Sequence, residues 1–235
     1  KVVIHNSNLL ITTDTHTKNL FLPFIDKAEV ICIPTPINTK VYSRKKETHK
    51  RRTLNEGLIL GFIGRLSPQK NLRTLLNAFT SARTSLDTSK LVIVGDGPER
   101  SLLMREARRL KVDKEVIFTG AVAENKKIEL LNSFDIFLMP SLYEGCPIAL
   151  LEAMASGKAI ISSDIPSIRE IVRHNEEAIL IDPSDVEALK RAILLLCNDP
   201  DLRAKLGRRA RERVKLYDAD RVYGWILNVY EELIR

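Results

Sequence analysis

The sequence predicts an α/β fold, in which a doubly wound, six-stranded parallel sheet carries helices on both faces. Short runs of consecutive apolar residues, typical of strands buried on both sides, alternate with helical stretches over residues 58–217. One helical stretch repeats apolar residues at i, i+3, i+4 and i+7 from Leu72 onward, which gives a single apolar face. The six expected strands are residues 58–63, 91–94, 116–118, 136–139, 159–161 and 178–181.

The residues before this sheet divide into two parts. Residues 1–40 predict a small strand–helix–strand unit that ends at Pro34 and Pro36. Residues 41–57 contain the run SRKKETHKRR and have little to bury, so we expect an exposed basic linker. Contact of this run with phosphate or with a membrane is the alternative. The elements expected in the first part are a strand at 2–4, a helix at 15–22 and a strand at 29–33.

Several helices carry start signals in the sequence. The triplet Gly97-Pro98-Glu99 places a proline and an acid at the start of the helix after the second strand. Ser184 and Glu187 form a capping-box pattern, and Asp199-Pro200 begins another helix. Residues 218–235 predict a final amphipathic helix.

The composition excludes several classes of protein. The 235 residues are 44% hydrophobic, yet no apolar run approaches the roughly 18 residues that span a bilayer. Three widely spaced cysteines lack metal-ligand spacing and favour a reducing, cytoplasmic compartment. The chain starts without Met and without a secretory signal, so we expect a fragment or a processed chain.

The net charge of +7 raises the question of an anionic partner. The chain has no aromatic-rich basic face and no nucleic-acid-binding signature, so we expect no nucleic-acid partner. A phosphate-bearing small ligand or the inner face of an anionic membrane would suit the charge equally well, and a solvated surface is the commonest explanation of such a surplus. Residues 203–215 carry seven cations against the single acid Glu212 and are the segment that would meet anionic lipid.

In the common strand order, the ligand crevice of a doubly wound sheet lies between the first and fourth strands. The first loop at this crevice is GRLSPQKN. In it Gly64 allows a close backbone approach, and Arg65 and Lys70 supply two cations. A surface arginine and a capping lysine are the simpler interpretation of these two residues.

The second loop at the crevice ends where a new helix begins. Gly145, Cys146 and Pro147 lead into that helix, whose free amides and dipole favour an anion. Two cations facing a helix N-terminus predict a diphosphate site.

Two carboxylates flank this helix start, with seven residues between them. Glu144 precedes the helix and can reach past a diphosphate toward an attached group. Glu152 falls on the inward-facing side of the helix, where an unpaired carboxylate is costly, so we expect it to accept hydrogen bonds, for example from the vicinal hydroxyls of a ribose. A buried salt bridge and a glycosidase carboxylate pair are the alternatives.

Other catalytic patterns are weak. Gly95-Asp96-Gly97 resembles the start of a dinucleotide fingerprint but has Arg100 at the sixth position and follows the wrong strand, so it predicts a tight strand-to-helix turn. The four histidines form no credible Ser-His-Asp set, and no metal-ligand cluster is present in the sequence.

These residues resemble the nucleotide-sugar-binding half of a retaining GT-B glycosyltransferase, the family that includes glycogen synthase, sucrose synthase and mannosyltransferases. The resemblance runs from about residue 29 to the C-terminus. It implies one Rossmann-like half of a GT-B fold. The motifs that carry it, in order, are ICIPTPIN, GRLSPQKN, LVIVGDGPE, VIFTGAV and EGCPIALLEAMASGKAIISSDIPSIREIV.

The resemblance implies a role for each matching residue. Arg65 and Lys70 would neutralise the leaving diphosphate, and Glu144 would bind hydroxyls of the donor sugar. Glu152 would hold the ribose. The reaction implied is hexose transfer from a UDP-, GDP- or ADP-linked sugar with retention of configuration and without a metal. The further donor-binding residues implied are Gly64, Gly120 and Val122, the last two beside the base, and the segment of Gly145, Cys146, Pro147 and Ile148, which would supply backbone N–H donors near sugar and phosphate.

The chain departs from the family pattern in three ways. Cys146 stands where a bulky apolar residue is more usual, and Asn71 where glycine is frequent. The chain is also short, so that residues 1–40 would be only the end of an N-terminal acceptor domain, on which the helix at 218–235 is expected to pack. A non-catalytic nucleotide-sugar-binding subunit completed by a partner chain is the alternative function, and an epimerase of the same fold is a third.

Overall fold

The computed structural model describes residues 8–25, 28–43, 57–86 and 88–234. Its main body is a six-stranded sheet in the order β5-β4-β3-β6-β7-β8, with every pair of neighbours parallel. The doubly wound fold and the position of the crevice, between the first and fourth strands of this sheet, are therefore confirmed. The strands are β3 (Ile59–Ile63), β4 (Lys90–Val94), β5 (Val116–Gly120), β6 (Ile136–Met139), β7 (Ala159–Ser163) and β8 (Ile179–Ile181).

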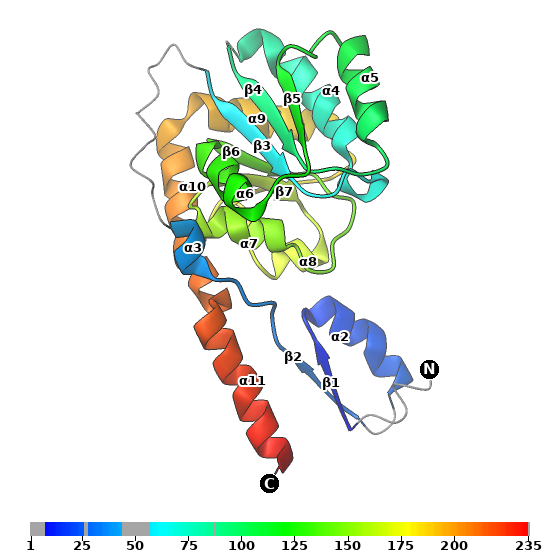
Figure 1. Cartoon of the computed structure of the whole chain (residues 1–235), viewed down its shortest axis with the longest axis vertical. Coiled ribbons are helices and arrows are strands. Elements are labelled where there is room, and N and C mark those ends of the chain that lie inside the picture. Colours follow the sequence, from blue (N-terminus) through cyan, green and yellow to red (C-terminus); the bar gives the residue numbers. More distant parts are fainter. Residues whose placement is uncertain (1–7, 26–27, 44–56, 87, 235) are drawn as a thin grey trace.

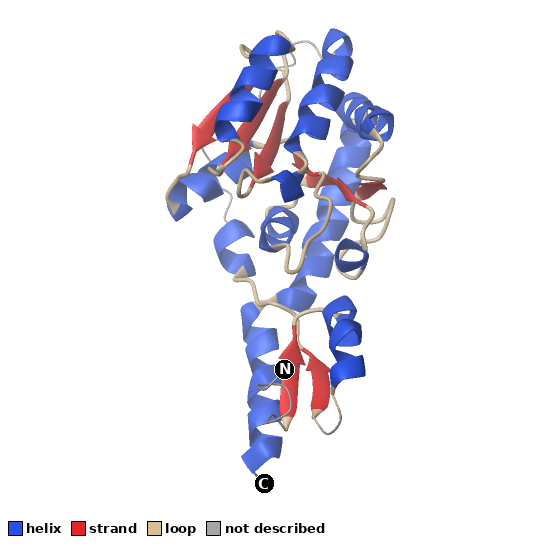
Figure 2. Ribbon diagram, turned by 90° about the vertical axis from the view of Figure 1, so that its right-hand side faces the viewer, coloured by secondary structure: helices blue, strands red, loops and turns tan. Residues whose placement is uncertain are grey.

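Helices cover both faces of the sheet (Figures 1 and 2). One hydrophobic cluster joins the sheet to three helices, in which Leu76, Leu103 and Ile193 are fully buried, and Leu206 of a fourth helix also belongs to it. The second cluster, on the other face, joins it to the helices of Leu131, Leu151, Ile168 and Ala210. The first three helices are α4 (Leu72–Ala82), α5 (Arg100–Arg109) and α9 (Val186–Asn198), and the others are α6 (Glu124–Ser133), α7 (Ile148–Ala155), α8 (Pro166–Arg169) and α10 (Pro200–Arg213).

The helix starts follow local capping chemistry, with one correction to the sequence analysis. Asp199 accepts a hydrogen bond from the Leu202 amide at 2.8 Å, with Pro200 in the first turn, as expected. The capping box at Ser184 is wrong: the N-cap of α9 is Asp185, and Ser184 instead donates to Asp182 Oδ1 at 2.6 Å. The helix begins one residue later because Asp185 supplies the cap itself.

A small unit precedes the sheet. β1 (Leu9–Thr12) pairs in parallel with β2 (Glu29–Cys32), and α2 (Thr15–Phe21) and a 3-10 turn (Leu22–Phe24) connect them. The strand predicted at 2–4 lies outside the described residues, and β1 was not expected because four residues carry little periodic signal. α3 (Thr39–Ser43) is a second unpredicted element at the start of the basic run, whose residues 44–56 are not described.

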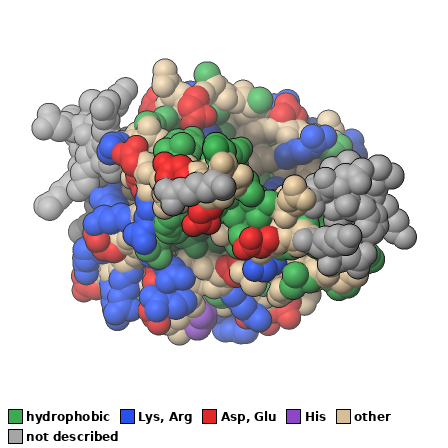
Figure 3. All heavy atoms as spheres, turned by 90° about the horizontal axis from the view of Figure 1, so that it is seen from below, with side chains coloured by type: hydrophobic (Ala, Val, Ile, Leu, Met, Phe, Trp, Pro, Cys, Tyr) green, Lys and Arg blue, Asp and Glu red, His purple; other side chains and the backbone are tan. Residues whose placement is uncertain are grey.

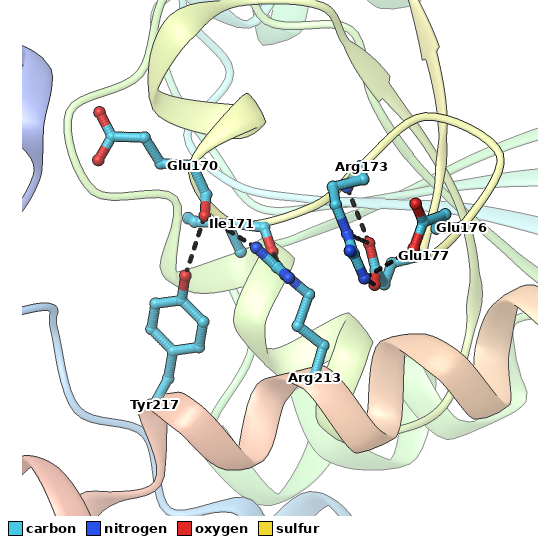
Figure 4. A network of polar contacts seen from close by, with 7 residues as sticks. All are labelled: Glu170, Ile171, Arg173, Glu176, Glu177, Arg213 and Tyr217. Carbon is cyan, nitrogen blue, oxygen red and sulfur yellow. Dashed lines mark hydrogen bonds and ion pairs between the residues drawn. The ribbon is translucent and has the colours of Figure 1, made fainter.

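Glu170, just after α8, joins this unit to the main body. Its carboxylate accepts hydrogen bonds from the amides of Thr15 and His16 at 2.8 and 3.0 Å, at the start of α2. Its carbonyl accepts from Tyr217 Oη at 3.3 Å, and Arg213 donates to the carbonyls of Glu170 and Ile171 (Figure 4). The link therefore runs from α2 through α8 to the end of α10.

The last helix, α11 (Ala219–Ile234), follows the 3-10 turn Val214–Tyr217 and lies with the small unit at the end of the molecule away from the sheet (Figure 1). Only Val222 is buried in it, and hydrophobic side chains gather at this end (Figure 3). Among the described helices, none is long and apolar enough to cross a membrane. The large exposed apolar residues of α11 are Tyr223, Trp225, Leu227, Tyr230, Leu233 and Ile234.

Candidate functional site

The loops after β3 and β6 meet at the carboxyl ends of the strands, as the topology requires. The Leu142 amide donates to the Gln69 carbonyl, and Gln69 Nε2 donates to the Tyr143 carbonyl, both at 2.8 Å. These reciprocal bonds hold the loop that carries Lys70 against the loop that carries Glu144. Residues far apart in sequence are thereby placed on the two sides of one crevice.

Lys70 and Glu144 form an ion pair across that crevice. Lys70 Nζ lies 2.7 Å from Glu144 Oε1 and 2.9 Å from Oε2, and the two side chains are 18% and 5% exposed. Arg65 is exposed, and its side chain makes no hydrogen bond or ion pair with the described part of the chain. The two predicted cations therefore differ, since one is engaged by a predicted sugar-binding acid and the other is free to meet a ligand.

Asn71 ends the short 3-10 turn Pro68–Lys70 in the left-handed conformation, with φ of 55°. This conformation explains why asparagine can stand where glycine is frequent in the family, because asparagine tolerates the left-handed conformation better than other non-glycine residues. Asn71 also adds what glycine lacks: its Nδ2 donates to the carbonyls of Pro140 and Pro183, at 3.2 and 2.7 Å. The side chain fixes Lys70 relative to the end of β6.

Gly95-Asp96-Gly97 forms the tight turn that the sequence predicts. A Cβ on Gly95, whose φ is 130°, would lie 1.9 Å from the carbonyl oxygen of Gly64, and one on Gly97 would lie 2.4 Å from that of Leu66. The glycines therefore let the turn after β4 pass directly against the loop after β3. They shape the crevice by this close packing of two loops.

The start of α7 carries four of the predicted donor-binding residues. Pro147 is the N-cap, and apart from the two chain neighbours no heavy atom of the described residues lies within 4 Å of a Cβ placed on Gly145, so a ligand can approach the backbone there. Cys146 Sγ donates to Thr35 Oγ1, and burial raises the pKa of its thiol. The Ile148 amide donates to the Cys146 carbonyl at 2.9 Å, and its expected role as a donor to a ligand stays a prediction.

A cavity of about 280 Å³ opens beside the start of α7. Gly145, Cys146 and Pro147 form one wall, Cys32 of β2 lines another, and Trp225 of α11 contributes a third. Arg65 and Lys70 do not line it. The cavity thus reaches the helix start from the side of the small N-terminal unit, whereas the two cations approach it from the side of β3.

The residues predicted beside the base lie at the end of β5. Gly120 has a φ of 73°, and its carbonyl accepts the Gly95 amide at 2.9 Å. Val122 packs against the second hydrophobic cluster. This loop leads directly into α6, two residues after Val122.

Glu152 is 5% exposed, which confirms the inward orientation expected from the helical wheel. Tyr42 Oη at 2.7 Å and Lys127 Nζ at 2.6 Å hold it in this structure, so the buried salt bridge that the sequence allowed as an alternative is present, with partners that the sequence did not identify. They come from α3 and α6, 110 and 25 residues away, and no local pattern connects them. Among the described residues, no group of His, Cys, Asp or Glu is arranged to hold a metal ion.

The family profile described as "Glycosyl transferases group 1" matches residues 43–213, well over half of the chain. The chain belongs to this family. It is 28% identical over 203 residues to the N-acetyl-alpha-D-glucosaminyl L-malate synthase of Bacillus anthracis, covering 85% of this chain and 52% of that protein. It is 33% identical over 177 residues to a GDP-mannose-dependent alpha-(1-6)-phosphatidylinositol monomannoside mannosyltransferase of Mycobacterium tuberculosis, covering 72% and 46%.

Solved structures of several enzymes and related proteins share the fold. Sucrose-phosphate synthase from Thermosynechococcus elongatus superposes with a TM-score of 0.87 at 23% identity, over 99% of this chain and 60% of that one. Anabaena Alr3699/HepE in complex with UDP and glucose gives 0.86 at 20% identity, over 96% and 64%. The chain spans about half the length of the curated relatives it matches. The GT-B resemblance is therefore confirmed at the level of family and fold.

Proposed function

We propose that this chain is the donor-binding part of a retaining hexosyltransferase that uses a nucleoside-diphosphate sugar. The observation that carries the proposal is the meeting of Lys70, Glu144 and the start of α7 at the switch point of the sheet, with Arg65 unpaired beside them. Relatives named as mannosyltransferases and structural neighbours in complex with UDP support it.

The Lys70–Glu144 pair suggests how the site would work. An ammonium group has three N–H donors, and two of them contact the Glu144 carboxylate, so a third remains for a phosphate oxygen. Lys70 would then link the sugar-binding acid to the leaving group. Arg65 and the free amides before Ile148 would add positive potential to the same diphosphate. The charge that develops on the leaving diphosphate would thus be stabilised by the chain's own cations and amides, without a metal.

Thermal unfolding of the chain with UDP, GDP, ADP and their sugar conjugates tests the donor site. A ligand at 100 times its Kd stabilises the folded state by about 2.7 kcal/mol, so the cognate nucleotide will raise Tm clearly. Arg65→Gln will reduce that rise, whereas Arg108→Gln, on the exposed face of α5, will not. If no nucleotide raises Tm, the donor-site proposal fails.

In this proposal, transfer also needs an acceptor-binding part beyond this chain, which matches 52% of the length of the Bacillus anthracis relative. We expect the protein extended to that length to transfer a hexose, and Lys70→Ala and Glu144→Ala each to abolish transfer. Proton NMR of the first-formed product would give its anomeric configuration, and inversion would refute the retaining mechanism. Nucleotide binding with no transfer to any acceptor would favour a non-catalytic subunit.

Contact with an anionic membrane through α10 stays a narrower proposal. Arg203, Arg211 and Arg213 donate to backbone carbonyls, and Lys215 pairs with Glu212 at 2.5 Å. The exposed cations left on this face are Lys205, Arg208 and Arg209. Co-sedimentation with vesicles that contain anionic lipid, but not with neutral vesicles, would support the contact, and equal binding to both would remove it.

A further inference from the structure

The carboxylate of Glu152 lies in a network built by three elements. Tyr42 Oη of α3 contacts it at 2.7 Å and Lys127 Nζ of α6 at 2.6 Å. Tyr42 also lies 2.8 Å from Glu124 Oε1, and Lys127 pairs with Glu124 Oε2 at 2.9 Å. Glu124 is the first residue of α6, so the network spans from the helix that starts at the diphosphate crevice to the loop at the end of β5.

Only one oxygen of Glu152 is used in this network. Tyr42 and Lys127 both contact Oε1, and no hydrogen bond reaches Oε2 from the described part of the chain. Oε2 is not one of the buried polar atoms that lack a partner, and the Glu152 side chain keeps 6% exposure. Glu152 therefore keeps two lone pairs of one oxygen for a ligand while its other oxygen is held in place.

The two holding groups are donors at neutral pH. Burial and the hydrogen bonds to both glutamates raise the pKa of Tyr42, so its hydroxyl keeps its proton. Burial opposes the charge on Lys127, yet the hydrogen bonds to Glu152 and Glu124 raise its pKa above the ordinary value. Tyr42 has a single hydroxyl hydrogen, so it donates to one glutamate at a time, and Lys127 neutralises the carboxylates between them.

The position of Oε2 determines what it can meet. The site proposed above places the diphosphate at the start of α7 and the base at Gly120 and Val122, just before Glu124. A ribose joins these two parts, and it offers vicinal hydroxyl donors to a carboxylate between them. Glu152 lies one turn inside α7 and shares its network with the first turn of α6, so it occupies this interval.

We propose that Tyr42 and Lys127 are positioning residues that hold Oε1 of Glu152 and leave Oε2 to accept a hydroxyl of the donor ribose, so that they set the preference for a ribonucleotide over a deoxyribonucleotide. The inference rests on the proposed donor site. The inference also gives α3 a role: this helix connects the small unit to the sheet, and its Tyr42 would belong to the ribose site. A site built around a hydroxyl rejects an analogue that lacks it, since the carboxylate oxygen is then left without a donor.

Isothermal titration of the 235-residue chain with UDP, GDP and ADP, and with their 2′-deoxy and 3′-deoxy forms, tests the role. For the diphosphate that binds, we expect one of the deoxy forms to bind at least about tenfold more weakly to the wild type. Tyr42→Phe and Lys127→Met should weaken the ribonucleotide but leave the deoxynucleotide almost unchanged, which brings the ratio of the two Kd values close to one. Lys127→Arg, which keeps the charge, should retain part of the discrimination.

Matched controls come from the same elements or the same residue types. Lys126→Met removes a neighbouring lysine that pairs with Glu129, and Tyr223→Phe removes a hydroxyl on exposed α11. Both should keep the wild-type ratio. The melting temperature without nucleotide is measured for every variant, and if Lys127→Met does not fold, Tyr42→Phe, which keeps the buried ring, decides the question.

The outcomes separate this inference from the proposed function. If the wild type binds none of the diphosphates, the donor site fails and the inference falls with it. If the wild type binds and prefers the ribonucleotide, but Tyr42→Phe weakens the ribonucleotide and the deoxynucleotides by the same factor, the network is only structural and the inference alone is overturned. A wild type that does not distinguish the forms overturns it as well.

Discussion

The Lys70–Glu144 pair gives the sharpest prediction about this site. Replacing Lys70 by Met leaves a carboxylate whose side chain is 5% exposed without its cation. Removing one partner of a buried ion pair costs about 3–5 kcal/mol, and because Lys70 retains 18% exposure we expect the lower end, about 3 kcal/mol. Glu144→Gln keeps an acceptor for the ammonium group and should cost about 1 kcal/mol.

The double variant distinguishes the pair from two independent effects. With both charges removed, no carboxylate is left unpaired, so the double variant should be about 2 kcal/mol more stable than the sum of the single changes predicts. The free energies of unfolding come from urea titrations with a common m-value. Lys126 and Glu129 are the control: the same 2.7 Å separation at 52% and 55% exposure should give a coupling of only about 0–0.5 kcal/mol. A coupling at Lys70–Glu144 no larger than that of the control would refute the buried pair.

Three further predictions concern the frame of the site. Asn71→Ala should lower the free energy of unfolding by about 2 kcal/mol. Asn71→Gly should lower it by roughly 1 kcal/mol less than that, because glycine accepts the left-handed conformation. Urea titration compares the two variants, and equal losses would show that only the side-chain hydrogen bonds matter. Gly95→Ala should cost about 3 kcal/mol, because its Cβ would meet the Gly64 carbonyl oxygen; a fully stable variant would contradict the close crossing. Burial opposes the charge on Glu177, yet its hydrogen bonds to Arg173 hold its pKa below the ordinary 4.5 (Figure 4). The stability that Glu177 contributes is therefore full above pH 4.5 and is lost as pH falls through the lower folded-state pKa. In an acid titration, Glu177→Gln should lose stability less steeply than the wild type, and an unchanged slope would contradict this.

Much of the fold could be predicted because its information is local. Each strand of the sheet is a short apolar run bounded by a turn, and each covering helix repeats its apolar residues with helical period. β1 and α3 were missed because four or five residues carry too little periodicity, and pairing with β2 or packing on α7 decides their structure. The start of α9 differed by one residue because two adjacent side chains were both able to cap it.

The candidate site also has features that the sequence predicted and features that depend on tertiary packing. The helical wheel placed Glu152 inward, and the topology placed Arg65, Lys70 and Glu144 at one crevice. Neither could show that Lys70 closes on Glu144, because side-chain pairing depends on distances that strand order does not give.

The sequence by itself determined the doubly wound sheet, the crevice between its first and fourth strands and the inward orientation of Glu152. These follow from periodicity and from the rule that parallel strands end at one edge. Only the tertiary structure decided what Glu152 touches. Tyr42 and Lys127 reach it from α3 and α6, and such contacts form only when the second hydrophobic cluster brings these helices against α7. Burial then makes a partner for the carboxylate obligatory, and packing selects which side chains supply it.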